Sequence, residues 1–342
     1  MQAVILAGGE GTRLRPLTTN VAKPILTLVD RPFIVYMLQW LRRHGVDDVI
    51  LCCGFGAEGV REVLGDGSEH GMRLRYVAES EPLGTGGPLL LASDLLDERF
   101  VVCNGDILTD MDLSAELEAH ERSGAVATLA LVAVEDPRVY GLVRCEEDGS
   151  VAEFVEKPAE IGDGAQLISA GAYVLERSVL ELIEPGRAVS IEREVWPALI
   201  GKGLHGHRAD GYWLDIGTPA RYLQGSFDII TGAVEVDAPA GAQGSAAIGA
   251  RCEIASDARV GELVVLGEGV RVGSCASIER SVVLAHAQIG DGCVLRESIV
   301  AERAKIGPYA ELEEDVVVGQ DAQIAAHRHV AAGTRVGPGE RL

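Results

Sequence analysis

Aliphatic residues recur every six positions along the last part of the chain. The series begins at Ile248 and ends at Val336, with one residue dropped after Leu284 and another after Ala301. Gly, Ala or Glu commonly follows the aliphatic residue. A six-residue repeat is typical of a parallel β-helix, in which three hexads form one triangular coil and bury their aliphatic side chains inside. The repeat therefore predicts about five coils in this part of the chain.

The first two thirds of the chain follow a different pattern, in which apolar runs alternate with helical segments. The runs "AVILA", "DDVILCC", "LRYVA", "FVVCNGD" and "VATLALVAV" read as strands, and "GLVRCEEDGSVAEFVEKP" reads as a hairpin around "EDGS". Helical periodicity fits residues 32–43, 86–96 and 114–123. This order predicts a mainly parallel sheet covered by helices, which binds ligands at the carboxyl ends of its strands.

These patterns predict a two-domain chain of the α/β class. We expect a Rossmann-like, mainly parallel sheet with helices on both faces over residues 1–231, and a left-handed parallel β-helix over residues 246–342. The small, Pro- and Gly-rich residues 232–245 are the expected linker.

The net charge limits the kinds of partner that the chain can bind, and its cysteines indicate the compartment in which it folds. The net charge of −22 argues against nucleic acid or a membrane surface as a partner, because both favour basic proteins. The seven cysteines include no C-x-x-C pair, so we expect reduced thiols in a cytoplasmic protein. No apolar run has the length of a membrane span, and no basic segment precedes the first apolar run as in a signal peptide.

The segment "LAGGEGTRLRPLTTNVAKP" places a glycine-rich turn directly after the first apolar run. It lacks the Gly-Lys pair of a P-loop, and Leu14 stands where a dinucleotide fingerprint needs its third glycine. Glycines nevertheless let backbone N–H groups approach a phosphate chain, and Arg13 adds a forked cationic donor. The alternative is an ordinary strand-to-helix turn. Two of the four lysines, Lys23 and Lys157, stand in Lys-Pro pairs, which suggests positions that need a compact charge.

Taken together, the motifs resemble those of the sugar-1-phosphate nucleotidyltransferases. "LAGGEGTRLRPLT", "EPLGTGGPL", "NGD", "YG", "EKP", "SIEREVWP" and "GYWLDIGTPARYL" occur in the order found in that family, and a hexapeptide β-helix follows as in many members. Three of these motifs, "EPLGTGGPL", "SIEREVWP" and the "WLDIG" within the last one, most resemble the branch that makes GDP-mannose from GTP and mannose-1-phosphate. The resemblance implies transfer of a nucleotidyl group from a nucleoside triphosphate to a sugar-1-phosphate, with release of pyrophosphate.

The resemblance also implies a Mg²⁺ ion, because two polyanions must be aligned and neutralised. Asp106 ends the strand-like run "FVVCNGD", and Asp215 lies in "WLDIG". By resemblance these two carboxylates hold the ion. Taken alone, either aspartate is better explained as a turn or cap residue, and only the family pattern reverses that interpretation.

The remaining roles are carried over position by position. The resemblance implies that Arg13 holds the departing pyrophosphate, that Lys23 contacts the α-phosphate where charge builds, and that Lys157 binds the phosphate of the sugar. The nucleotide-binding set implied in this way is Leu6, Ala7, Gly8, Gly9, Gly11, Thr12, Arg13, Glu79, Gly84 and Thr85. The sugar-phosphate set is Gly141, Glu156, Lys157, Ser169 and Gly171.

Two positions bear on specificity. Glu79 lies where the family reads the base; a carboxylate can accept the adjacent N1–H and N2–H groups of guanine, whereas an amide suits uracil or thymine better. A solvated acidic residue is the alternative. Ser169 stands where the guanylyl branch usually has Asn, which weakens the mannose assignment more than the reaction class.

Other readings stay open at this point. A thymidylyl- or uridylyltransferase acting on glucose-1-phosphate, or an enzyme that accepts several nucleotides, is the alternative within the class. A non-catalytic subunit of the same fold is the alternative outside it, although such copies tend to lose the residues that are present here. We expect His286, His327 and His329 to be exposed residues of the coils rather than a second active site. We also expect homo-oligomers through the β-helix, whose strand edges need covering.

Overall fold

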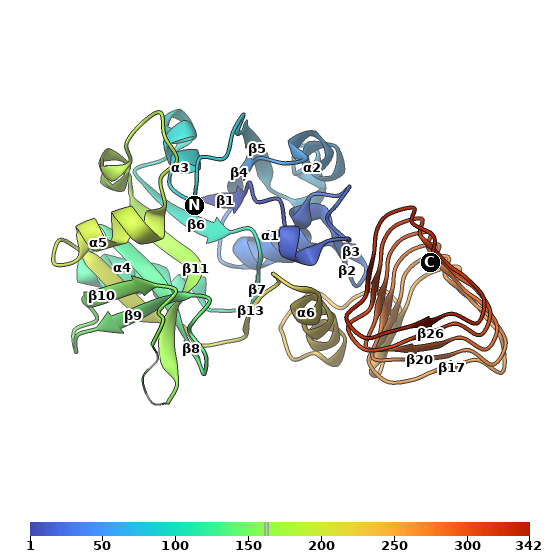
Figure 1. Ribbon diagram of the computed structural model, residues 1–342. Coiled ribbons are helices and arrows are strands. Elements are labelled where there is room, and N and C mark those ends of the chain that lie inside the picture. The colour runs from blue at the N-terminus through green and yellow to red at the C-terminus, as the bar shows by residue number, and fades with distance from the viewer. Residues whose placement is uncertain (161, 163) are drawn as a thin grey trace. The chain divides into compact units, whose positions relative to one another are not determined.

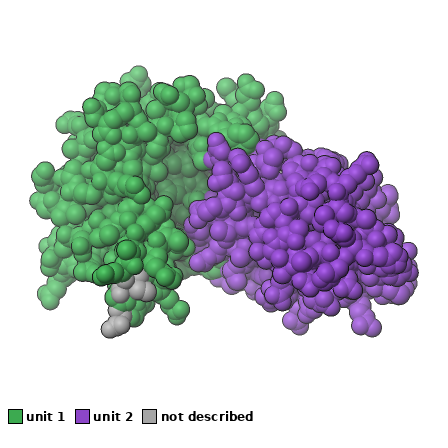
Figure 2. All heavy atoms as spheres, in the orientation of Figure 1, with its two compact units in different colours: residues 1–9, 37–213 green, residues 10–36, 214–342 purple. Residues whose placement is uncertain are grey.

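The computed structural model describes residues 1–160, 162 and 164–342. The chain forms two compact units (Figures 1 and 2), one of residues 1–9 and 37–213 and the other of residues 10–36 and 214–342. We call them unit 1 and unit 2. No helix among the described residues is both long and apolar enough to cross a membrane.

Unit 1 is built on a nine-stranded mixed sheet, and the predicted mainly parallel core is confirmed. Its main path runs β10-β9-β11-β6-β1-β4-β5, and β8 joins β11 to β12. Strand β1 pairs in parallel with both β4 and β6, and β4 pairs in parallel with β5. The strands are β1 (Gln2–Ala7), β4 (Asp48–Cys53), β5 (Arg73–Ala78), β6 (Arg99–Asn104), β8 (Ala127–Val134), β9 (Gly141–Cys145), β10 (Val151–Glu156), β11 (Gln166–Glu176) and β12 (Leu204–Arg208).

The strands that the sequence predicted in unit 1 all form, and "GLVRCEEDGSVAEFVEKP" is the antiparallel hairpin β9-β10. In the central strand β1, Ala3, Val4 and Ile5 are fully buried, as expected for a parallel strand covered on both faces. The predicted helices also form, the second as a short α-helix followed by a 3₁₀ turn. The α-helices of the chain are α1 (Phe33–Arg43), α2 (Ala57–Leu64), α3 (Gly87–Leu91), α4 (Leu113–Ser123), α5 (Trp196–Leu199) and α6 (Pro219–Thr231).

Unit 2 contains the parallel β-helix that the hexads predicted. Its coils stack three parallel sheets, so that equivalent strands of successive coils pair in register. The first sheet contains β15 (Ala246–Ile248), β18 (Val264–Leu266), β21 (Val282–Val283), β24 (Ile299–Val300), β27 (Val317–Val318) and β30 (Arg335–Val336). The second contains β16 (Glu253–Ile254), β19 (Arg271–Val272), β22 (Gln288–Ile289), β25 (Lys305–Ile306) and β28 (Gln323–Ile324). The third contains β17 (Arg259–Val260), β20 (Ser277–Glu279), β23 (Val294–Arg296), β26 (Glu311–Leu312) and β29 (His329–Val330). A short strand, β14 (Ala242–Gln243), pairs with β15 in antiparallel fashion.

In the structure, each of the two one-residue gaps in the repeat lies one corner earlier than the sequence pattern predicted. Leu266 pairs with Val283, not with Leu284, and Val283 pairs with Val300, not with Ala301. The corner that precedes each of these strands is therefore the shortened one. Buried backbone groups at these two corners need hydrogen-bond partners, and the hydroxyl of Ser281 supplies one. Ser281 Oγ donates to Glu279 O (2.7 Å) and accepts from Ser298 N (3.1 Å).

Two further sequence predictions concern individual side chains, the histidines of the coils and the cysteines of the whole chain. His286, His327 and His329 are exposed, as predicted for coil residues. All seven cysteines are free thiols.

Helix α4 of unit 1 buries a carboxyl group. The Glu116 side chain is almost completely buried, and its Oε1 has no hydrogen-bond partner among the described residues. Burial raises the pKa of Glu116 well above its ordinary value of 4.5, and a hydrogen bond from the Ala130 backbone only partly offsets this. The group is therefore protonated in the folded protein over a range in which it ionises in the unfolded chain.

Glu116→Gln is expected to stabilise the protein increasingly as pH rises. In the wild type, a folded-state pKa above 4.5 makes stability greatest below 4.5 and lowers it as pH rises toward the folded-state value. The neutral variant escapes this loss, so its advantage should grow by about 1.4 kcal/mol per pH unit within that window. Urea denaturation at about pH 4, 6 and 8 measures the difference. Glu118→Gln, at a side chain that is 72% exposed on the same helix, is the control. A difference for Glu116→Gln that stays constant with pH would contradict the prediction.

Candidate active site

Three parallel strands of unit 1 end at the same edge, and a glycine directly follows each of them. Gly8 follows β1 and Gly54 follows β4; Gly105 follows β6 and donates its N–H to Leu6 O (2.9 Å). A Cβ on Gly54 would lie 2.6 Å from Gly8 O, and one on Gly105 would lie 2.7 Å from Leu6 O. The backbone from Leu6 to Gly8 therefore packs closely against the backbone at Gly54 and Gly105, and only glycine fits at those two positions.

Asp106 follows Gly105 at this edge and is partly exposed. The preceding Gly105 lies beside Leu6 and Ala7 of β1, so Asp106 stands at the carboxyl edge of the sheet, where a ligand-binding carboxylate is expected. Gly54 was not among the residues predicted from the sequence. The signal that could have found it was a glycine directly after an apolar strand, the same signal that identified Gly8.

Glu79 lies over Gly8, which brings together two residues of the predicted nucleotide set. Glu79 follows β5, and its N–H donates to Cys53 O (2.8 Å). Its Oε2 accepts from Leu83 N (3.1 Å), and a Cβ on Gly8 would collide with its Oε1. Partial burial raises the pKa of this carboxyl. The Glu79 carboxylate is therefore fixed by a hydrogen bond and partly shielded from water, unlike a freely solvated side chain.

The rest of the glycine-rich loop belongs to unit 2, where a second cluster forms. Gly11 has a positive φ of 62° and precedes a 3₁₀ turn (Thr12–Leu14) that carries the exposed Arg13. A Cβ on Gly217 would lie 2.8 Å from Arg13 Nη2, so the guanidinium lies over this glycine. Gly217 stands two residues after Asp215, the last residue of β13 (Trp213–Asp215). Arg13 and the end of this strand are therefore neighbours.

Lys23 belongs to the same cluster. A Cβ on Gly11 would lie 3.3 Å from Lys23 Cβ, and Thr18 Oγ1 donates to Gly11 O (2.7 Å). The lysine also lines a small apolar pocket, together with Leu14, Leu26, Leu28, Phe33, Ile216 and Tyr222. Packing of the aliphatic stem restricts where the ammonium group can point. The structure thus brings together Gly11, Arg13, Lys23 and the Asp215 strand in unit 2.

The predicted sugar-phosphate residues gather on the hairpin β9-β10 and on strand β11. Gly141 pairs with Glu156, and a Cβ on Gly141 would collide with the Phe154 ring and lie 3.2 Å from Glu156 Oε2. Lys157 has a positive φ of 54°, and its Nζ lies 3.7 Å from Glu156 Oε1. Burial, followed by the charge of Glu192, raises the pKa of Glu156. The Lys157 side chain is 58% exposed, which leaves room for an anion to approach it.

Strand β11 departs from regular pairing around Ser169 and Gly171, the two residues of this strand that were predicted to bind the sugar-phosphate. The register with β8 shifts between Ser169 and Tyr173. Gly171 has a positive φ of 74° there, and a Cβ on it would lie 2.7 Å from Asn104 Nδ2. Trp213 Nε1 donates to Ala170 O (2.7 Å). The hydroxyl oxygen of Ser169 is buried without a hydrogen-bond partner among the described residues. A buried, unsatisfied hydroxyl is suited to a polar ligand.

Gly84 and Thr85 are bound to a segment to which the sequence analysis gave no role. Gly84 has a positive φ of 76° and contacts the Val189 backbone, and Gly86 N donates to Val189 O (2.8 Å). Thr85 Oγ1 donates to Glu192 Oε2 (2.7 Å). The segment belongs to the motif "SIEREVWP", which includes a π-helix, η6 (Ile191–Val195). Such helices are often found at functional sites.

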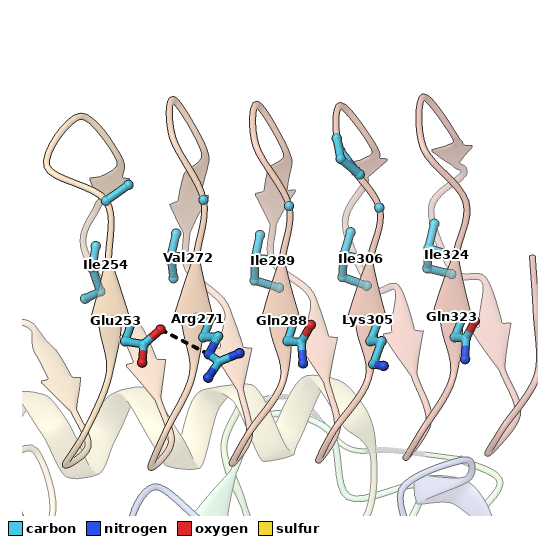
Figure 3. Close-up of a pocket in the computed structure, with 15 residues that line it drawn as sticks. Glu253, Ile254, Arg271, Val272, Gln288, Ile289, Lys305, Ile306, Gln323 and Ile324 are labelled. Atoms are coloured by element: carbon cyan, nitrogen blue, oxygen red, sulfur yellow. Dashed lines mark ion pairs between the residues drawn. The ribbon is translucent and has the colours of Figure 1, made fainter.

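A broad groove lies on the second sheet of the β-helix, far in sequence from every predicted site residue. Figure 3 shows Glu253, Arg271, Gln288, Lys305 and Gln323 in one row beside a row of aliphatic residues. Glu253 and Arg271 form an ion pair of 3.1 Å. The groove holds both signs of charge and none of the predicted residues.

Comparison with protein families gives matches to both parts of the chain. A family model described as nucleotidyl transferase matches residues 2–232, and one described as the GMPPB C-terminal domain matches residues 242–339.

Named relatives match over most of their length. A mannose-1-phosphate guanylyltransferase of Mycobacterium tuberculosis is 37% identical over 86% of this chain and 83% of its own. A mannose-1-phosphate guanyltransferase of Schizosaccharomyces pombe is 35% identical over 98% of both chains.

Solved structures resemble about two thirds of the chain. HddC from Yersinia pseudotuberculosis has a TM-score of 0.57 and 28% identity, covering 66% of this chain and 97% of that chain. A candidate glucose-1-phosphate thymidylyltransferase from Bacillus anthracis has a TM-score of 0.61 and 26% identity, covering 66% of this chain and 94% of that chain.

Proposed function

We propose, because the chain belongs to the nucleotidyl transferase family, that it transfers a guanylyl group from GTP to mannose-1-phosphate. The family and the relatives make the chain a nucleotidyltransferase acting on a nucleoside triphosphate and a sugar-1-phosphate. The choice of GTP and mannose-1-phosphate is our proposal. The structural observation that carries it is the Glu79 carboxylate held over Gly8, together with the names of relatives that match along most of the chain.

The reaction is an in-line displacement that needs alignment and charge neutralisation rather than a covalent nucleophile. A phosphate oxygen of the sugar-1-phosphate attacks the α-phosphorus of GTP, and the bond from that phosphorus to the β-phosphate oxygen breaks. The products are GDP-mannose and pyrophosphate. We assign Arg13 to the departing pyrophosphate, because its exposed guanidinium suits phosphate oxygens, and Lys23 to the α-phosphate.

We propose that Asp106 and Asp215 hold Mg²⁺. Both are partly exposed carboxylates at strand ends, and hard oxygen ligands of this kind, with phosphate oxygens, suit that ion. When bound, the ion neutralises phosphate oxygens. Asp106 belongs to unit 1 and Asp215 to unit 2.

The sugar-1-phosphate site is proposed on the hairpin and on β11 of unit 1. Lys157 binds the phosphate through its exposed ammonium group. Glu156, Ser169 and the backbone at Gly141 and Gly171 face the sugar hydroxyls. The unsatisfied Ser169 hydroxyl supports this placement, since a sugar supplies both donors and acceptors.

Ser169 also supports a second candidate, the thymidylyl- or uridylyltransferase acting on glucose-1-phosphate. Its side chain is shorter than the Asn usual in the guanylyl branch, so it reaches less far toward the sugar. Pyrophosphate release from five nucleoside triphosphates with mannose-, glucose- and N-acetylglucosamine-1-phosphate decides between the candidates. Fastest release from GTP with mannose-1-phosphate supports the first, and fastest release from dTTP or UTP with glucose-1-phosphate supports the second.

Glu79→Gln is expected to shift the nucleotide preference away from GTP by about 10-fold or more, toward UTP or dTTP. The carboxylate accepts two guanine N–H donors, whereas the amide offers one acceptor and one donor, so one guanine donor loses its partner. The measurement is kcat/KM for GTP, UTP and dTTP at saturating sugar-1-phosphate. Glu81→Gln, an exposed residue of the same loop, is the control. An unchanged nucleotide profile in Glu79→Gln would remove the argument for guanine.

A further inference from the structure

Glu192 lies between the two substrate regions of unit 1. Its helix η6 packs against β10, the strand that ends at Glu156. The ring of Trp196, directly after η6, makes an edge-to-face contact with Tyr173 of β11 at 5.1 Å. On the other side, the residues before η6 are hydrogen-bonded to the loop that carries Gly84 and Thr85.

One oxygen of Glu192 is fixed by two hydroxyl groups. Thr85 Oγ1 and Ser190 Oγ each donate to Oε2 at 2.7 Å. Thr85 Oγ1 in turn accepts from Ile191 N at 2.9 Å, so the threonine is held as well. The carboxylate is therefore oriented by its neighbours, and its second oxygen, Oε1, has no hydrogen-bond donor among the described residues.

Glu192 lacks an ion-pair partner of the kind that Glu194 has, within the described part of the chain. Glu194, on the same helix, forms a 2.6 Å ion pair with Arg187, whereas Glu192 forms no ion pair within the described part of the chain. Glu192 is also only partly exposed. After burial, its negative charge is the next cause that raises the pKa of the Glu156 carboxyl. Two partly desolvated carboxylates near each other are unfavourable unless a ligand supplies donors.

The chemistry of the surrounding residues indicates which donors these are. Lys157 and Arg193 are the cationic groups that act on Glu156, and Lys157 is already assigned to the phosphate of the sugar substrate. The sugar itself is neutral and carries several hydroxyl donors. A carboxylate with one free oxygen is a strong acceptor for such a hydroxyl.

We propose that Glu192 binds the sugar, with Oε1 accepting a hydrogen bond from a hydroxyl of the sugar-1-phosphate, and thereby helps to select which sugar is used. The proposal rests on the proposed function, since it concerns the acceptor substrate of that reaction. It adds a specificity residue on a different segment from those inferred from the sequence.

Glu192→Gln tests the proposal while keeping the shape of the side chain. The amide oxygen can still accept from Thr85 and Ser190, but the charged acceptor is lost. We expect kcat/KM for the sugar-1-phosphate to fall about 10- to 100-fold, mainly through a higher KM, while KM for the nucleotide stays within about twofold. Glu194→Gln is the matched control on the same helix and should retain wild-type values for both substrates.

A purely structural or repulsive role predicts the opposite. Removing a negative charge near a phosphate would then leave the sugar KM unchanged or lower it, and either result overturns the proposal. A series of sugar-1-phosphates that each lack one hydroxyl identifies the contact. For one deoxy sugar, the losses from the missing hydroxyl and from Glu192→Gln should not add, whereas additive losses across the whole series would also overturn the proposal.

The same assay separates this inference from the proposed function. If the wild-type protein forms no nucleotide sugar from any tested pair, the proposed function itself fails. If the wild-type protein turns over but Glu192→Gln matches it, only the role of Glu192 fails.

Discussion

Asp106→Ala is expected to give a folded protein whose turnover is lower by about 1,000-fold or more. The proposed reaction develops negative charge on phosphate oxygens, and groups that neutralise such charge commonly contribute this much to kcat. Asp106 follows Gly105 at the end of β6 and is partly exposed, so its loss leaves the buried core of the sheet intact. Asp215→Ala should have an effect of similar size, because the two carboxylates are proposed to act on the same ion.

The measurement is pyrophosphate release at saturating substrates, with circular dichroism and thermal unfolding to verify the fold. Asp94→Asn, an exposed residue outside the predicted site, is the control and should retain full turnover. The dependence of binding on the ion gives a second readout. Mg²⁺ should strengthen nucleotide binding to the wild type more than to either alanine variant. Wild-type turnover in both variants would contradict the assignment of these aspartates to the metal.

The β-helix could be predicted from sequence because its core is made of locally repeating units. Each coil buries the same kind of aliphatic side chain at the same place, so the periodicity appears without knowledge of long-range contacts. The position of the dropped residues could not be predicted in the same way. Val283 and Leu284 are both buried aliphatic residues, and only the pairing of Val283 with Leu266 shows which of them continues the ladder.

The candidate site was predictable where a strand end and a glycine coincide. Gly8 and Asp106 were found because chain direction places them at the carboxyl edge of a parallel sheet. The role proposed for Glu192 was not predicted, because it depends on a contact with Thr85, which is distant in sequence. The motif "SIEREVWP" contributed to the family resemblance, but nothing in it shows that one glutamate is paired with an arginine and the other is not.

Lys23→Met is the second variant for which we expect a very large loss, with kcat falling about 100- to 1,000-fold. Lys23 is proposed to contact the α-phosphate, where charge increases in the transition state, so its contribution should be greatest there. Methionine can keep the apolar contacts that the lysine stem makes beside Leu14 and Tyr222. The loss should therefore report the charge rather than a disrupted pocket. Lys202→Met, at an exposed lysine outside the site, is the matched control.

Lys157→Met separates the two Lys-Pro lysines by the kinetic parameter that changes. Lys157 is proposed to bind a phosphate whose charge is already present in the ground state, so its loss should mainly raise KM for the sugar-1-phosphate. Lys23→Met should instead lower kcat with smaller changes in either KM. Rate measurements at varied concentrations of each substrate distinguish these patterns. If both variants changed only the sugar KM, Lys23 would belong to the sugar-phosphate site, and the division of the substrates between the two lysines would be wrong.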